Sequence, residues 1–252
     1  MSEREEYMAG VPCWVDTTSP DPQAARDFYG GLFAWEIEAG AEYTIARLGE
    51  RAVAGIGSAP LASWNTYVRV ADAEATVERA VAAGATVLLG PVGGIAVVAD
   101  TAGAVLCVRE ALGAQLVNEP GAWMMSSLHT PDLSAATAFY GAVFGWEPEP
   151  LGPLTLLRLP GYTGGEPGQP IPRDVVAAIA PPVPAEHVPP HWNVNFRVDD
   201  ADAVVERVPA LGGAVLAAPF DTPGFRSAVI QDPNGAVFSI SEVVLPQPSS
   251  RS

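Results

Sequence analysis

The feature that most constrains the fold of this chain is a motif that occurs twice. Residues 16–36 return as residues 127–147, and both copies contain Phe-Tyr-Gly followed by Phe, a small residue, Trp and Glu. The offset from Phe28 to Phe139 is 111 residues, 139 minus 28. Two further pairs of segments match in the same order: 64–91 with 192–219, and 100–110 with 232–242. Repetition of this length predicts two modules on one plan, each the size of a small domain.

Each module reads as a strand, a helix and three strands, followed by the same series again. Asp21 and Asp132 stand before the first helical pattern of their modules, where a carboxylate can cap a helix. In the first module this helix is expected at 21–33. We therefore expect an α+β fold of tandem βαβββ modules, with an N-terminal module at 8–118 and a C-terminal module at 122–246.

The second module departs from the first in two places. The repeat offset grows from 111 to 128 residues across 160–190, which indicates an insertion of 17 residues rich in Pro and Gly. We expect an irregular loop there with one short strand at 175–180, serving as a lid, an interface arm or a surface ornament. Pro209 falls late in the second helix of this module and should end or kink it, because proline removes a helical hydrogen bond.

Composition excludes several classes of function. The formal net charge is −16, which argues against nucleic acid and anionic membranes as partners, because both attract basic surfaces. All 13 basic residues are Arg, so neither a lysine Schiff base nor a lysine-containing phosphate loop is available. No apolar run reaches membrane-spanning length, and the acidic N-terminus is not that of a signal peptide. Two cysteines, Cys13 and Cys107, fit a reducing compartment, so a cytoplasmic protein is expected.

The motif around Phe28 and Phe139, together with the segment DPNGAVFSI that closes the second module, resembles the vicinal-oxygen-chelate superfamily. This group includes glyoxalase I, bleomycin resistance proteins and extradiol dioxygenases. The tandem layout is similar to that of two-module actinobacterial members described as glyoxalase-like or hydroxylase-like. The resemblance covers residues 10–245 and implies that each module forms a curved mixed sheet cupped around a pocket. It implies no single reaction, because the superfamily contains lyases, isomerases, dioxygenases and binding proteins.

Metal-dependent members of this superfamily hold a divalent ion with His or Gln, His and Glu on three strands of the cup. The resemblance places these positions on Trp14, Asn65 and Cys107 in the first module, and on Met125, Asn193 and Ser239 in the second. Divalent ions need clusters of His, carboxylate or thiolate ligands, which neither set supplies. We therefore expect no metal, no other cofactor and no metal-dependent glyoxalase activity.

Side chains that share these strand faces are expected to line a small-molecule pocket, because residues of a strand alternate between its two faces. In the first module the expected lining is Trp14, Asp16, Asn65, Tyr67, Cys107 and Arg109, with Arg69 on the same face. In the second module it is Met125, Ser127, Asn193, Asn195 and Ser239, with Arg197 and Ser241 on the same face. Aromatic, soft and hydrogen-bonding groups are usual in such sites. Core filling is the alternative for Trp14, Met125 and Cys107.

The candidates for catalysis are Asp16, Arg109 and His191. Asp16 and Arg109 are expected on adjacent inward-facing strands, where they form either a salt bridge or an acid–base pair. His191 could act as a general base, but like His129 and His187 it has no carboxylate partner evident in the sequence. A structural role is the alternative for all three histidines.

The sequence thus predicts a protein that binds a small apolar or aromatic organic molecule without a metal, and the resemblance implies that it is of the antibiotic-resistance or secondary-metabolism accessory type. One alternative is a metal-independent lyase, isomerase or hydroxylase-like enzyme acting on a small metabolite. A structural protein without a ligand is another. The identity of the ligand and the cup that holds it stay open. So does the question whether the modules close on each other or swap with a second chain in a homodimer.

Overall fold

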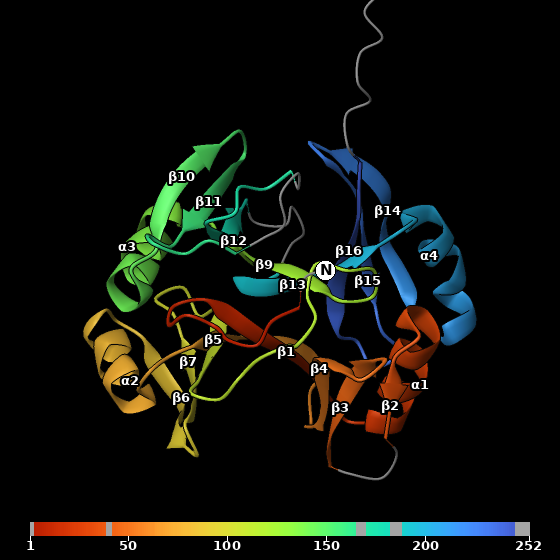
Figure 1. The fold of residues 1–252 in the computed structure, drawn as a ribbon, viewed down its shortest axis with the longest axis horizontal. Coiled ribbons are helices and arrows are strands. Elements are labelled where there is room, and N and C mark those ends of the chain that lie inside the picture. The colour runs from red at the N-terminus through yellow and green to blue at the C-terminus, as the bar shows by residue number, and fades with distance from the viewer. Residues whose placement is uncertain (1–2, 39–41, 165–169, 182–187, 245–252) are drawn as a thin grey trace, which may run out of the picture.

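The computed structural model describes residues 3–38, 42–164, 170–181 and 188–244, which form two eight-stranded mixed sheets (Figure 1). The first half contains β1 (Pro12–Ser19), α1 (Pro22–Phe33), β2 (Glu36–Ile37), β3 (Tyr43–Leu48), β4 (Arg51–Ser58), β5 (Ser63–Arg69), α2 (Ala73–Ala82), β6 (Thr86–Val92), β7 (Ile95–Ala99) and β8 (Val105–Arg109). The second half contains β9 (Trp123–His129), α3 (Leu133–Phe144), β10 (Glu147–Leu151), β11 (Leu154–Arg158), β12 (Val175–Ala180), β13 (His191–Val198), α4 (Ala201–Arg207), the 3-10 helix η1 (Pro209–Leu211), β14 (Ala214–Thr222), β15 (Phe225–Gln231) and β16 (Val237–Val243).

The two sheets have the same strand order. The first runs β2-β3-β4-β1-β5-β8-β7-β6 and the second runs β10-β11-β12-β9-β13-β16-β15-β14, so each strand is replaced by its repeat counterpart. In both sheets the first strand pairs with the fourth in parallel and with the fifth in antiparallel fashion. This arrangement confirms the expected α+β fold of tandem βαβββ modules.

The helices begin where the capping residues predict. The Asp21 carboxylate accepts hydrogen bonds from the backbone N–H groups of Gln23 and Ala24, both at 3.1 Å, and Pro22 occupies the first turn of α1. Asp132 caps α3 in the same way. The second helix of module two ends at Arg207, ahead of Pro209, and continues only as η1, as predicted from the proline.

The insertion of module two falls within 160–190, as expected, but the strand inside it is not an additional one. The predicted strand at 175–180 exists as β12, but it is the counterpart of β4 and pairs with β9 as β4 pairs with β1. Gly55 and Ala178 are equivalent, because Gly55 pairs with Asp16 and Ala178 pairs with Ser127, so the repeat offset there is 123 residues, 178 minus 55. Of the 17 extra residues, 12 (123 minus 111) therefore lie between β11 and β12, and 5 (128 minus 123) lie between β12 and β13. Within 160–190, residues 165–169 and 182–187 lie outside the described part of the chain.

The two sheets meet along their central strands, and their cups open in opposite directions (Figure 1). β5 lies against β13, and the hydroxyl groups of Thr66 and Ser126 form a buried hydrogen bond of 2.7 Å between β5 and β9. The helices associate across the module boundary as well, since α1 lies beside η1 and α2 beside α3. The modules therefore close on each other within one chain.

The repeated Phe-Tyr motif forms this boundary. The Tyr29 hydroxyl donates to the Asp232 carboxylate of the other module at 3.0 Å and accepts from the Trp64 indole at 2.9 Å. The reciprocal bonds join Tyr140 to Asp100 at 2.8 Å and Trp192 to Tyr140 at 2.9 Å. The tyrosine of the repeated motif in each module thus forms a hydrogen bond with the other module.

Within the described residues, every helix is too short or too polar to cross a bilayer.

Candidate functional site

The cup of the first module is organised around the buried carboxyl group of Asp16 on β1. Its Oδ1 accepts a hydrogen bond from the Asn65 side chain at 2.9 Å, and its Oδ2 accepts from the hydroxyls of Tyr67 at 2.8 Å and Tyr43 at 3.0 Å. The Trp14 indole N–H donates in turn to the Tyr43 hydroxyl at 2.9 Å. The structure therefore brings together Trp14, Asp16, Asn65 and Tyr67, four of the residues predicted for this cup.

Burial changes the acidity of this carboxyl group. Asp16 is 2% exposed, and the loss of solvation raises its pKa above that of an ordinary aspartate. The hydrogen bonds from Asn65, Tyr67 and Tyr43 and the positive charge of Arg109 act in the opposite direction and only partly offset the burial. The carboxyl group therefore holds a proton at a higher pH than a solvated aspartate would.

Tyr43, which was not among the predicted site residues, completes this network because two glycines face it. A Cβ atom at Gly55 would overlap the Tyr43 hydroxyl, and one at Gly57 would lie 3.0 Å from the Tyr43 ring. Glycine inside a strand marks a place where another group approaches the backbone closely. Gly55 and Gly57 in one short strand are therefore the sequence signal that could have identified an approaching side chain.

Arg109 lies over aromatic rings and makes no ion pair with Asp16. Its guanidinium carbon is 5.3 Å from the centre of the Trp14 ring and 5.8 Å from that of Tyr67, which is cation–π geometry. The predicted salt bridge is wrong because the two residues are not on adjacent strands: β5 lies between β1 and β8. The aromatic residues of β1 and β5 therefore hold this guanidinium in place.

Cys107 on β8 is 2% exposed, and burial, followed by the charge of Asp16, raises the pKa of its thiol to about 12. The side chain is therefore a neutral thiol at physiological pH and is not poised as a nucleophile.

The cup of the second module carries a row of amide and hydroxyl groups. Asn193 donates to Ser239 at 2.9 Å, and Asn195 donates to Ser241 at 2.9 Å. Ser241 also shares a hydrogen bond of 2.8 Å with Ser227 of β15. Four of these residues occupy the positions expected from strand alternation, and Ser227 joins them from the neighbouring strand.

Two histidines stack at one end of this row. The rings of His129 and His191 are parallel within 8°, with centroids 5.1 Å apart. His129 also lies 3.4 Å from the Ser127 hydroxyl, and burial lowers the pKa of its imidazole, so the neutral form is favoured. Both rings contact backbone carbonyl groups, of Pro181 and Pro189 respectively. His187, the third histidine, lies outside the described residues.

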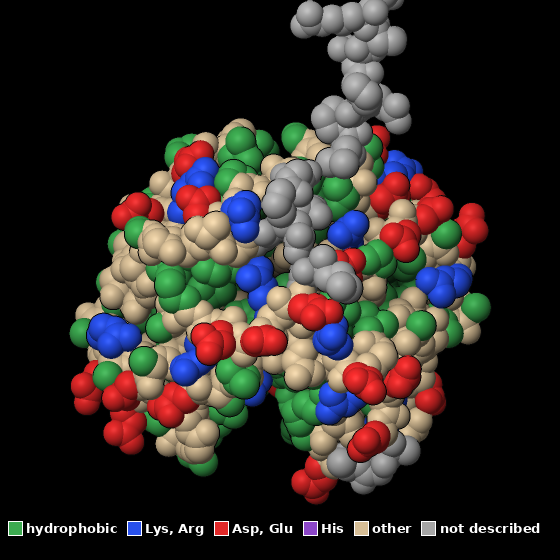
Figure 2. Space-filling view, viewed as in Figure 1, with side chains coloured by type: hydrophobic (Ala, Val, Ile, Leu, Met, Phe, Trp, Pro, Cys, Tyr) green, Lys and Arg blue, Asp and Glu red, His purple; other side chains and the backbone are tan. Residues whose placement is uncertain are grey.

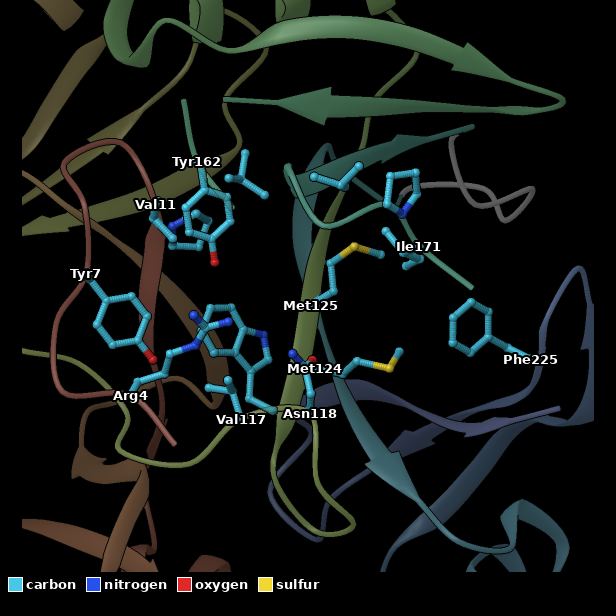
Figure 3. Close-up of a pocket in the computed structure, with 15 residues that line it drawn as sticks. Arg4, Tyr7, Val11, Val117, Asn118, Met124, Met125, Tyr162, Ile171 and Phe225 are labelled. Atoms are coloured by element: carbon cyan, nitrogen blue, oxygen red, sulfur yellow. The ribbon is translucent and has the colours of Figure 1, made fainter. Parts of the chain in front are cut away.

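A cavity of about 90 Å³ opens at the start of β9 (Figure 3). This exceeds the roughly 10–15 Å³ that admits one water molecule. Met124 and Met125 project from β9 into it, with Ile171 and Phe225 on one side and Tyr7 and Tyr162 on the other. The remaining lining residues are Arg4, Val11, Pro12, Val117, Asn118, Trp123, Pro172, Val175 and Val176. Of the residues predicted to bind a ligand, Met125 lines this cavity, whereas Ser127, Asn193, Asn195 and Ser239 are not among its lining residues.

The N-terminal segment supplies one wall of the cavity, which sequence reasoning missed. The backbone of Arg4 bonds to Gln115 at 3.0 Å, and the Tyr7 hydroxyl donates to the Ala114 carbonyl at 2.7 Å. Both contacts join segments more than a hundred residues apart, so no local pattern could have indicated them.

The residues at the metal-ligand positions of the superfamily do not fit a divalent ion. The Asn65 amide is bonded to Asp16, the Trp14 indole to Tyr43, and the Asn193 amide to Ser239. Indole, amide, hydroxyl and thioether groups, together with the single buried thiol of Cys107, do not form a divalent site. Across the described ranges, His, Cys, Asp and Glu nowhere gather in threes in a way that could hold a metal ion.

Comparison with known proteins connects this architecture to a family. The glyoxalase-like domain family matches residues 14–109 and 125–241. The putative glyoxylase CFP32 of Mycobacterium bovis is 36% identical over 262 residues, which cover 95% of this chain and 97% of the relative. The anthracycline biosynthesis protein DnrV of Streptomyces peucetius is 34% identical over 268 residues, and DauV of Streptomyces sp. strain C5 is 32% identical over 268 residues. Each of these two alignments covers 94% of both chains.

Solved structures share the fold at lower identity. The Mn(II)-bound glyoxalase from Novosphingobium aromaticivorans aligns with a TM-score of 0.64 and 18% identity, over 93% of this chain and 82% of that one. The 2,3-dioxygenase LapB from Pseudomonas sp. KL28 aligns with a TM-score of 0.63 and 13% identity, over 97% of each chain. At this level of identity the likeness concerns the fold, and it confirms the resemblance inferred from the sequence.

Proposed function

We propose that this chain, which belongs to the glyoxalase-like domain family of the vicinal-oxygen-chelate superfamily, binds a small aromatic organic molecule without a metal, as an accessory protein of secondary metabolism. The observation that carries the proposal is a cavity with both apolar and polar lining residues, next to a strand position with an unpaired polar atom in the second module. Met125 lines the cavity, and its register partner across β9 and β13 is Asn195. The Oδ1 atom of Asn195 is buried and has no hydrogen-bond partner in the described part of the chain.

These groups favour an aromatic ligand with a hydroxyl or N–H group. The thioethers of Met124 and Met125 and the ring of Phe225 offer the adaptable apolar contacts that suit a flat ring. Because Asn195 gives its amide N–H to Ser241, its carbonyl oxygen is left to accept a hydrogen bond from the ligand. If the amide were assigned in the opposite orientation, its N–H₂ group would lack a partner instead, so one unpaired polar atom remains in either case.

The relatives support the accessory role. Two of them, DnrV and DauV, are named as anthracycline biosynthesis proteins. Together with the metal-ligand positions, which carry Trp, Asn, Cys, Met and Ser, this favours a binding role in a biosynthetic setting over metal-dependent glyoxalase chemistry.

A titration with naphthol, a neutral aromatic probe with one hydroxyl, tests the proposal. Naphthol should raise the melting temperature of the protein in a concentration-dependent way, because it binds only the folded state. Met125→Trp fills the cavity and should weaken binding about tenfold or more. Met8→Trp is the matched control, because Met8 is 42% exposed and does not line the cavity. Equal affinity of the two variants, or no stabilisation of the wild-type protein, would contradict the proposal.

A second candidate is a metal-independent enzyme that transfers a proton at Asp16. The observation that favours it is the buried Asp16 carboxyl group, whose raised pKa brings it closer to the range of a general acid or base. In that case Asp16→Asn should abolish turnover of a substrate while naphthol binding in the second module stays unchanged. Turnover that survives this substitution would exclude the role.

A further inference from the structure

The cup of the first module contains two arginines side by side. β5 and β8 pair in parallel, and Arg69 is the register partner of Arg109. Arg69 follows Asn65 and Tyr67 on the same face of β5, and Arg109 lies over the Tyr67 ring. Both guanidinium groups therefore belong to the face that carries Asp16 and its hydrogen-bond donors.

Neither arginine has a carboxylate partner in the part of the chain that the structure describes. This is unusual in a chain with a net charge of −16, where acidic partners are abundant. Other arginines do use them: Arg51 pairs with Glu3, Arg158 with Glu149 and Asp174, and Arg226 with Asp202 and Asp221. By contrast, one Nη of Arg69 and the Nε of Arg109 are buried without a hydrogen-bond acceptor among the described residues.

The nearby carboxyl group does not fill this role. Both oxygens of Asp16 accept hydrogen bonds from the neutral side chains of Asn65, Tyr67 and Tyr43. Arg109 lies against the Trp14 and Tyr67 rings, outside ion-pair distance of Asp16. The cationic N–H groups of the pair are thus left for an acceptor that the described residues do not supply.

The second module shows that the fold does not require this pair. The residues equivalent to Arg69 and Arg109 are Arg197 and Ser241. Arg197 donates an Nη–H to the Asn118 carbonyl at 2.5 Å, and Ser241 bonds to Asn195 and Ser227. The Nε of Arg197 is also buried without an acceptor among the described residues, so the modules differ in number of cations: the first presents two guanidinium groups where the second has one arginine, bound to a carbonyl, and a hydrogen-bonded serine.

The surroundings of the pair suit an organic acid with an apolar body. Ile95 and Val97 on β7 are the register partners of Arg109 and Cys107, so they stand on the same face. Arg69, Arg109 and Tyr67 are all partly exposed, so a solute can reach them. Figure 2 shows the molecule hollowed between the projecting ends of β6–β7 and β3, on the side toward which this cup opens.

We propose that Arg69 and Arg109 bind the oxyanion group, carboxylate or phosphate, of a small organic molecule in the cup of the first module. Guanidinium groups form paired hydrogen bonds with both kinds of oxyanion. The stacking of Arg109 on Trp14 and Tyr67 orients its guanidinium group before a ligand binds, so less side-chain conformational freedom is lost on binding. This site is separate from the cavity of the second module and does not depend on it.

Calorimetric titration of the full chain with benzoate, benzamide and inorganic phosphate tests the site. Benzoate should bind, and benzamide, which has the same shape and no charge, should not. Arg69→Gln and Arg109→Gln should each weaken benzoate binding about tenfold or more. Arg197→Gln is the matched control at the equivalent position of the second module and should leave benzoate binding unchanged.

Each outcome decides. Binding of phosphate but not benzoate assigns the site to phosphorylated ligands. The proposal is overturned if neither anion binds the wild-type protein, if benzamide binds as well as benzoate, or if Arg197→Gln weakens binding as much as the other two. Should Arg109→Gln fail to fold, Arg109→Lys is the alternative variant. It keeps the positive charge but loses the paired N–H donors of the guanidinium group, so it should still weaken benzoate binding. Naphthol binding should be the same in the Arg69 and Arg109 variants as in the wild-type protein, which separates a failure here from a failure of the proposed function.

Discussion

The buried carboxyl group of Asp16 lies at the centre of a hydrogen-bonded cluster built from three strands of the first module. Trp14 belongs to the same strand, Asn65 and Tyr67 come from β5, and Tyr43 comes from β3. Three neutral donors satisfy a carboxylate without neutralising its charge, which is why burial dominates its acidity. This group should therefore make the stability of the protein depend on pH.

The sign of that dependence follows from linkage. Because the folded state raises the pKa of Asp16, it binds the proton more tightly than the unfolded state does. The protonated form therefore favours folding at acid pH, and this contribution is lost as the pH rises through the pKa of the unfolded and then of the folded state. Asp16→Asn removes the titrating group, so the stability of the wild-type protein relative to the variant should fall as the pH rises above about 4.

Urea unfolding of both proteins at several pH values measures this difference. Its slope should not exceed about 1.4 kcal/mol per pH unit, the limit for one proton. Parallel stability curves for the two proteins would show that the pKa of Asp16 is not raised.

At the scale of elements, β4 has glycine at the two positions where the Tyr43 side chain of β3 lies against it. Gly55 is the register partner of both Asp16 and Ile45, and the Tyr43 side chain occupies the space that a Cβ atom would take. The absence of a side chain at Gly55 therefore leaves room for Tyr43 in the cup. Any larger residue at this position of β4 would displace Tyr43.

Gly55→Ala should therefore destabilise the protein by about 1–3 kcal/mol, the usual cost of overpacking, and displace Tyr43 from Asp16. Gly90→Ala in β6 is the matched control, because nothing lies within 4 Å of a Cβ atom there. Denaturant unfolding gives the energies, and the proton resonance of the Tyr43 hydroxyl reports the displacement. A Gly55→Ala protein as stable as the Gly90→Ala control would show that Tyr43 does not occupy this space.

Elements with a local signature could be predicted from the sequence, whereas contacts between distant elements could not. Asp21 and Pro209 fix helix ends through their own side chains, so the starts and stops of helices were predicted correctly. The relation of Asp16 to Arg109 depends on the order of strands in the sheet, which neither segment contains, and the predicted salt bridge was wrong for that reason. The repeat predicted which faces form the two cups, but it could not show that Tyr43 enters one of them.

The metal-ligand positions illustrate the same limit in another way. The sequence identifies Asn65 and Asn193 as equivalent, yet their amides have different partners, an aspartate in one module and a serine in the other. Equivalent backbone positions therefore carry different chemistry, and only the neighbouring side chains reveal it. The role of these residues in binding a ligand stays a prediction.

At the scale of the whole molecule, each module completes the other. The Tyr29 hydroxyl reaches Asp232, and the Tyr140 hydroxyl reaches Asp100. The Trp146 indole donates to the Gly10 carbonyl of the other module, and the Trp35 indole donates to the Gly121 carbonyl in the segment that joins the modules. All these groups are buried. The two sheets should therefore unfold together.

Tyr29→Phe tests this coupling, because it leaves the Oδ2 atom of Asp232 and the Trp64 indole N–H without their partner. Each unpaired buried group costs about 1–3 kcal/mol, so the variant should lose at least that much stability. Tyr162→Phe is the control, since the Tyr162 hydroxyl donates to no acceptor among the described residues. Scanning calorimetry should show one two-state transition for the wild-type protein and for the variant, at a lower temperature for the variant. Two separate transitions in either protein would mean that the modules unfold independently.

The reciprocity of these bonds also bears on how the two cups came to differ. Two identical copies of a one-module chain would satisfy the same interlock, and they would necessarily present two identical cups. When both copies belong to a single polypeptide, their sequences need not be identical, so one half has an arginine at position 109 while the other has a serine at 241. Fusion thus allows the two cups to bind different ligands while the hydrogen bonds between the modules are kept.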